Sequence, residues 1–193
     1  GQNGKRVTTD VISEPATKTF NSFDDYVFFE KDSLNINEMG RQWVSHPCYN
    51  NPNQTFELKL RNPISSANAT LRASVVGKVS QNTNISISAA GSNYNFPTFS
   101  ASQFNRLEGI MNISPSATVA VNLMYNNTSN PAGLAFLDQI SVAYKANLSF
   151  GNEQFNFRFL DELDEVNAFS FSGAATIWNV TDLTNARIVS NNK

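Results

Sequence analysis

The sequence has little of the chemistry on which most enzymes depend. It contains one cysteine, Cys48, and one histidine, His46, among 193 residues. A single cysteine excludes an internal disulfide and a cysteine-rich zinc site, and a single histidine leaves few groups for acid–base catalysis near neutral pH. These absences favour a binding or structural role over an enzymatic one.

Charged residues are also scarce, at 16% of the chain, and 14 Lys and Arg nearly balance 16 Asp and Glu. Binding to a polyanion requires a clustered excess of basic side chains, so this balance argues against nucleic acid as a partner. The longest wholly apolar stretch runs only from Gly133 to Leu137, whereas a bilayer span needs roughly 20 residues. We therefore expect neither a nucleic-acid partner nor a membrane span.

Uncharged polar residues take the place of charge, with 27 Asn, 21 Ser and 13 Thr. In secreted β-proteins such residues fill turns and exposed strand positions. The chain also begins and ends abruptly, without a signal peptide. We therefore expect it to be a segment of a longer, exported protein.

Alternation of apolar and polar residues predicts strands along most of the chain. The apolar positions of the five clearest runs are Phe56, Leu58 and Leu60; Leu71, Ala73 and Val75; Ile85, Ile87 and Ala89; Val119, Val121, Leu123 and Tyr125; and Phe155, Phe157 and Phe159. Turn clusters rich in Asn, Pro and Gly separate them. Many short strands joined by such turns predict an all-β fold, an antiparallel β-sandwich with jelly-roll topology.

One or two short helical turns are expected within this fold. One runs from Asp32 to Met39, with Asp32 or Ser33 as N-cap and Gly40 as the stop, and the second covers Ser102 to Leu107. We treat residues 1–193 as a single sandwich region. A sub-boundary can be drawn near residue 150, after which residues 151–193 complete the sandwich or form a small second sheet.

His46 and Cys48 stand two positions apart and would share a face in extended backbone, as the two groups of a thiolate–imidazole pair must. No glycine-rich turn that could form an oxyanion site accompanies them, and a plain loop or core role is the favoured interpretation. The acidic run from Asp161 to Glu165 could offer oxygens to calcium but lacks the spacing of a calcium loop. We expect no catalytic residue, metal site or cofactor in this chain, with calcium bound at this acidic run as the alternative.

Asp138 is a more informative carboxylate. Alternate residues of a strand point to the same face, so Asp138 is expected on the face of Phe136, Ile140, Val142 and Tyr144. A carboxylate among such neighbours must find partners, because an unpaired buried charge is costly. We expect a structural bond to backbone N–H groups or to a basic side chain, with a metal or ligand site as the alternative.

Two aromatic residues, Trp43 and Tyr94, are candidates for stacking on sugar rings. Trp43 lies in one stretch with Tyr49, and Tyr94 lies in another with Phe96 and Phe99. Stacking requires exposed, coplanar rings. The 15 Phe against five Tyr and two Trp favour a core-filling role for most of the aromatic residues.

Three stretches, in order, resemble PorU-type proteins, the gingipain-like cysteine peptidases that act as sortases of the type IX secretion system in Bacteroidetes. Phe28 to Trp43 resembles the family's E-K-D-x-x-N … G-R-x-W stretch, Leu134 to Val142 its aromatic-Leu-Asp-x-Ile-x-Leu strand, and Phe171 to Asp182 its closing V-W-D-V-T-D run. The residues that carry the resemblance are Glu30, Lys31, Asp32, Asn35, Gly40, Arg41, Trp43, Asp138, Trp178 and Asp182. Asn179 departs from the pattern, where Asp is more usual.

The resemblance implies a non-catalytic segment, because the family's catalytic His and Cys lie in a peptidase domain that follows such a β-sandwich. It implies a location at the bacterial cell surface, associated with the outer membrane. The expected partners are the downstream peptidase domain of the same chain and a secretion-system partner or cargo protein. The parent protein would process C-terminal signals of secreted proteins. The alternative is a carbohydrate-binding or adhesive jelly-roll module of a secreted bacterial protein.

Overall fold

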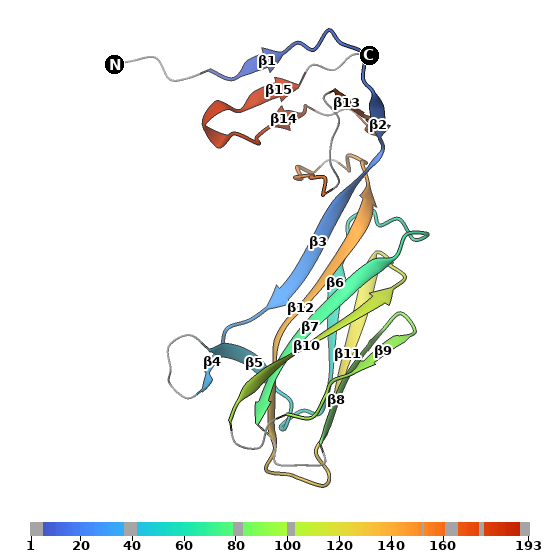
Figure 1. The fold of residues 1–193 in the computed structure, drawn as a ribbon. Coiled ribbons are helices and arrows are strands. Elements are labelled where there is room, and N and C mark those ends of the chain that lie inside the picture. The colour runs from blue at the N-terminus through green and yellow to red at the C-terminus, as the bar shows by residue number, and fades with distance from the viewer. Residues whose placement is uncertain are drawn as a thin grey trace, which may run out of the picture. The chain divides into compact units, whose positions relative to one another are not determined.

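The structure is a computed structural model that describes residues 6–36, 42–78, 83–99, 103–151, 153–160, 166–173 and 176–189. Its regular structure is almost entirely β (Figure 1). The strands are β1 (Thr8–Asp10), β2 (Lys18–Phe20), β3 (Ser22–Glu30), β4 (Leu34–Asn35), β5 (Trp43–Pro47), β6 (Asn53–Lys59), β7 (Ala69–Lys78), β8 (Asn84–Ala89), β9 (Ser92–Asn95), β10 (Asn105–Ile113), β11 (Thr118–Asn126), β12 (Leu134–Asn147), β13 (Asn167–Phe169), β14 (Trp178–Asn179) and β15 (Arg187–Val189). A short 3-10 helix, η2, spans Leu183–Asn185.

The contacts between residues divide the chain into two compact units. The sandwich unit is Asp24–Asn147, and the terminal unit combines Gly1–Phe23 with Leu148–Lys193. Each unit is described by itself. The single region expected over residues 1–193, with its sub-boundary near residue 150, stays a prediction.

Eight consecutive strands, β5 to β12, form the main part of the two facing sheets of the sandwich unit. In the first sheet the order is β10-β7-β12-β5, with β4 beyond β5 and β3 also pairing with β12. In the second sheet the order is β6-β11-β8-β9. These orders are the jelly-roll connectivity of two interlocked Greek keys, so the predicted antiparallel β-sandwich is confirmed.

The core of the sandwich unit follows the period-2 pattern of the sequence. In β11, Val119, Val121, Leu123 and Tyr125 are buried while the residues between them are exposed. This is the alternation expected of a sheet with one face on the core and one in solvent. The runs around Phe56, Leu71, Ile85 and Val119 are confirmed as β6, β7, β8 and β11.

The structure places strand residues in both predicted helical turns, although Ile36 of the first has 3-10 conformation. Leu34 and Asn35 form β4 and pair with Val44 and Trp43 of β5, so strand pairing outweighs the capping signals of the segment. Residues 37–39 of that predicted turn lie outside the described residues. In the second predicted turn, Asn105 to Leu107 belong to β10, which pairs with β7 along its whole length.

The terminal unit contains a three-stranded sheet, β1-β15-β14, and a parallel pair, β2 and β13. Its aromatic rings form a cluster with centroid distances of 4.8 to 6.3 Å, made of Phe20, Phe23, Phe155, Phe157, Phe159, Phe169 and Phe171. The predicted strand at Phe155 to Phe159 is wrong, because these residues lie outside the described strands. Their alternation reflects ring packing into this cluster instead.

Candidate functional site

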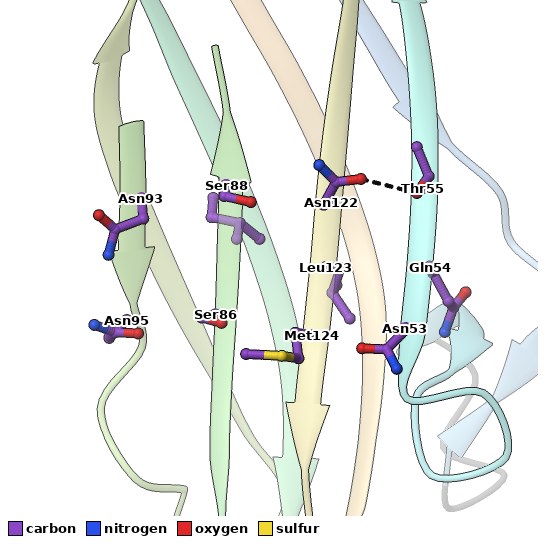
Figure 2. A pocket seen from close by; sticks show the side chains of 11 residues that line it. Asn53, Gln54, Thr55, Ser86, Ser88, Asn93, Asn95, Asn122, Leu123 and Met124 are labelled. Atoms are coloured by element: carbon purple, nitrogen blue, oxygen red, sulfur yellow. Dashed lines mark hydrogen bonds between the residues drawn. The ribbon is translucent and has the colours of Figure 1, made fainter. Parts of the chain in front are cut away.

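A hollow with a volume of about 500 Å³ lies on the outer surface of the second sheet. Figure 2 shows its side chains over four adjacent strands, β6, β11, β8 and β9. The strand registers arrange the outward side chains in two rows. One row is Thr55, Asn122, Ser88 and Asn93, and the next is Asn53, Met124, Ser86 and Asn95.

We call these eight residues the polar face. Seven of them carry an amide or a hydroxyl group, and the eighth, Met124, is 54% exposed. A hydrogen bond of 2.8 Å from Thr55 Oγ1 to Asn122 Oδ1 joins neighbouring strands across the face (Figure 2). No charged side chain of the described residues lines the hollow. The polar face can therefore donate and accept hydrogen bonds, but it offers no charged group to a charged ligand.

The outer surface of the first sheet has a different chemistry. Tyr26 and Phe28 of β3 are 46% and 60% exposed, with centroids 6.1 Å apart and an interplanar angle of 15°. Their neighbour Asp24 forms a 2.7 Å ion pair with Lys145, and Tyr144, on the buried face of β12, donates a 2.9 Å hydrogen bond to Asp25. Asp25 faces the core, because it accepts the hydrogen bond from Tyr144. Successive residues of a strand point to opposite faces, so Tyr26 and Phe28 project away from the core. We call them the aromatic pair.

The two rings proposed to stack on sugars are not brought together. Trp43 is 43% exposed on β5 of the first sheet. Tyr94, on β9 of the second sheet, is half-buried, and its ring lies over Gly109 of β10, where an added Cβ would come within 2.6 Å of it. Because β12 and β7 separate β5 from β10, Trp43 and Tyr94 stand towards opposite edges of the sandwich.

The described motif residues of the first stretch lie in or next to β3, β4 and β5. Glu30 ends β3, and exposed Lys31 and Asp32 lead into β4. Asn35 pairs with Trp43 in the β4–β5 ladder. Gly40 and Arg41 lie outside the described residues.

The closing motif belongs to the terminal unit. Trp178 of β14 pairs with Ile188 and is 50% exposed. Asp182 is the N-cap of η2, and its Oδ1 accepts hydrogen bonds from the Thr184 backbone N (2.9 Å) and Oγ1 (2.7 Å). Asn179 similarly accepts from the Thr181 N at 3.1 Å, so the amide takes the turn role available to a carboxylate there.

Asp138 is 5% exposed, and its Oδ1 accepts a 3.0 Å hydrogen bond from Arg106 Nη2 in an ion pair. The expected basic partner is therefore present. The expectation that Asp138 shares one face with Phe136, Ile140, Val142 and Tyr144 is wrong, because a β-bulge interrupts β12 between Leu137 and Gln139. Phe136 packs in a small cluster with Val44 and Val76 on the outer side of the first sheet, whereas Ile140 beyond the bulge pairs with Ala73 of the core.

His46 and Cys48 do not form a catalytic pair in this geometry. Cys48 is fully buried, and its Sγ lies 3.5 Å from the backbone carbonyl of His46. The His46 Nδ1 lies 2.6 Å from Ser45 Oγ, and its ring packs against Phe29 and Phe56. Burial, and then the charge of Lys31, lower the pKa of His46.

The Cys48 thiol should be inert in the folded chain. Burial raises its pKa from 9.0 to about 12, so the nucleophilic thiolate is almost absent at pH 8. We expect no reaction with a disulfide reagent such as Ellman's reagent in native buffer, and one thiol per chain after unfolding in guanidinium. Rapid labelling of the native chain would contradict this burial.

The described residues contain no group of three or more His, Cys, Asp and Glu side chains that could hold a metal ion. The acidic run from Asp161 to Glu165 lies outside them, so the calcium alternative stays a prediction. Within the described part of the chain, no helix is both long enough and apolar enough to cross a membrane.

Neither a known protein family nor a curated protein matches this sequence. Among solved structures, the chain is similar to a segment of dimeric latent PorU from Porphyromonas gingivalis, with a TM-score of 0.74 and 18% identity. This similarity covers 96% of the chain and 19% of PorU, so the chain spans about a fifth of that protein. At this identity the likeness shows the fold.

A second likeness is to the CBM35 module of Abf62 from Cellvibrio japonicus. It has a TM-score of 0.42 and 14% identity, and covers 64% of the chain and 99% of the module.

Proposed function

We propose that this chain is a non-catalytic accessory β-sandwich segment of a cell-surface, gingipain-like cysteine peptidase that resembles the type IX secretion sortase. The observation that carries the proposal is the fold shared with a PorU segment over 96% of the chain. The motif residues from Glu30 to Asp182 resemble that family in the same order. The burial of Cys48, the chain's one cysteine, supports a catalytic thiol located elsewhere in the parent protein.

The role of the segment is to position the downstream peptidase domain. Protein–protein interfaces are enriched in aromatic side chains at their centres, with polar groups at the rim. The aromatic pair supplies two exposed rings, and the Asp24–Lys145 ion pair beside it supplies a polar border. We assign the peptidase-domain contact to this surface.

In this proposal the parent protein acts at the bacterial cell surface, in association with the outer membrane, and processes C-terminal signals of secreted proteins. Cargo or another secretion-system component would be held by the assembled parent. The 193 residues contribute position and contact, and the chemistry belongs to the peptidase domain.

Binding between this chain and the peptidase region of its parent, produced as separate proteins, tests the positioning role. We expect the double change Tyr26→Ser and Phe28→Ser to weaken binding by about tenfold or more, because buried aromatic anchors dominate such interfaces. Isothermal titration calorimetry would measure this change.

Met124→Ser is the matched control, since Met124 is an equally exposed apolar residue on the other sheet. It should leave the affinity unchanged. Equal affinity for the double variant and the unaltered chain, or the absence of binding by the unaltered chain, would overturn the positioning role.

A further inference from the structure

The polar face departs from the residue preferences of its own strands. Asparagine is disfavoured in β-strands, where β-branched and aromatic residues fit better. Nevertheless four asparagines, Asn53, Asn93, Asn95 and Asn122, occupy outward positions in three of the four strands of the second sheet. Local choices that oppose the surrounding structure are expected at functional sites.

These side chains are presented to solvent with unused hydrogen-bonding capacity. In the part of the chain that the structure describes, the one side-chain hydrogen bond within the polar face joins Thr55 to Asn122 (Figure 2). Each asparagine amide offers two N–H donors and a carbonyl acceptor, and each hydroxyl offers both functions. The face is therefore a dense array of mixed donors and acceptors held on a rigid sheet.

We propose that the polar face binds a neutral oligosaccharide. A sugar hydroxyl both donates and accepts hydrogen bonds, as the amides and hydroxyls of this face do. No side chain of the hollow carries a positive charge that could form an ion pair with a phosphate, sulfate or carboxylate on a ligand. The cost of removing such a group from water would not be offset, so the face favours an uncharged ligand. The nearest charged outward side chains of β6, Glu57 and Lys59, lie beyond the hollow.

Met124 supplies the apolar contact that such a ligand needs. It is 54% exposed and stands between Asn53 and Ser86 in its row. Sugar rings carry C–H groups on their faces, and the flexible methionine side chain can adapt to them. The four strands span about 14 Å, from three inter-strand spacings of roughly 4.8 Å, so the hollow suits a short oligosaccharide.

This site goes beyond the proposed function and does not depend on it. The polar face belongs to the second sheet, whereas the aromatic pair projects from the first sheet. A failure of glycan binding would therefore leave the peptidase-domain contact untouched, and the reverse also holds.

Titration of the complete 193-residue chain with neutral oligosaccharides tests the site. The probes are hexasaccharides of glucose, mannose, galactose and xylose, each added to about 10 mM, beyond the 1 mM range of weak binding. Two-dimensional ¹⁵N NMR follows the backbone amides and the asparagine side-chain NH₂ groups. We expect saturable shifts with at least one probe, concentrated on β6, β8, β9 and β11.

The double change Asn93→Ala and Asn122→Ala should weaken this binding by about tenfold or more, since two amides of one row are removed together. Asn112→Ala is the matched control, because Asn112 is an exposed strand asparagine on the first sheet. It should bind as the unaltered chain does. Met124→Arg is a second test variant, whose added charge and bulk should also reduce binding.

Several results would overturn the site. One is the absence of saturable shifts with all four probes. Another is undiminished binding by a double variant whose NMR spectrum shows the native fold. Binding restricted to charged oligosaccharides, such as oligogalacturonate, or shifts confined to the first sheet would also contradict a neutral-glycan site on this face.

Discussion

Replacing Leu71 by alanine should lower the free energy of unfolding of the sandwich unit by about 2 to 5 kcal/mol. Leu71 is fully buried on β7, the strand between β10 and β12 in the first sheet. Its register partners are Met111 and Val142, which are also buried, so the lost methyl groups leave a cavity that the surrounding strands cannot easily close. Urea titration followed by circular dichroism measures the loss.

Ile110→Ala is the control for this prediction. Ile110 lies on the neighbouring strand β10 but is 47% exposed, so its truncation removes little buried surface. Its effect should stay below about 1 kcal/mol, as for most surface changes. Comparable losses for the two variants would contradict the placement of the core between the two sheets.

Replacing Gly77 by alanine should destabilise the same unit by about 1 to 3 kcal/mol through overpacking. A Cβ at this position would lie 2.7 Å from the Phe99 ring and 2.8 Å from the carbonyl oxygen of Leu134. The Leu134 oxygen belongs to β12, which pairs with β7, so the backbone cannot retreat without breaking the ladder. The glycine therefore permits the close approach of these strands.

Gly151→Ala is the corresponding control, because an added Cβ there meets no atom within 4 Å. Gly151 belongs to the terminal unit, and its replacement should change the free energy of unfolding of the sandwich unit by no more than about 0.5 kcal/mol. If Gly77→Ala were as stable as Gly151→Ala, the close packing of Phe99 over β7 would be wrong.

The sequence predicts the sandwich well where one face of a strand is buried and the other is solvated. In β8 and β11 the apolar residues fall on alternate positions, so parity alone identifies the core side. The same argument fails at Asp138, because the bulge shifts parity by one residue and depends on the pairing with β7. Bulges of this kind leave no signal in a single strand.

Two other errors have a shared cause in tertiary contacts. Asp32 and Gly40 are good helix boundary residues, but Leu34 lies opposite Val44 and takes part in a strand ladder. Phe155 and Phe157 alternate like a strand, but their rings pack against Phe23 rather than joining a sheet. Local patterns cannot distinguish these outcomes, because each is decided by a distant segment.

The candidate surfaces were the least predictable features. Tyr26 and Phe28 alternate with Val27 and Phe29, so both faces of β3 carry apolar residues. The sequence therefore does not show which face of β3 points outward. The eight residues of the polar face lie far apart in the sequence. Only the registers of β6, β8, β9 and β11 bring them side by side. Outward asparagines in predicted strands were a visible signal of it, but an Asn-rich composition obscured that signal.

The central claim, that this chain is the accessory sandwich of a cysteine peptidase, is tested most directly by sequencing the parent gene beyond the codon for Lys193. The account predicts an uninterrupted reading frame that continues into a domain with a peptidase His and Cys pair. A stop codon directly after Lys193, or a continuation into a domain without that pair, would contradict it.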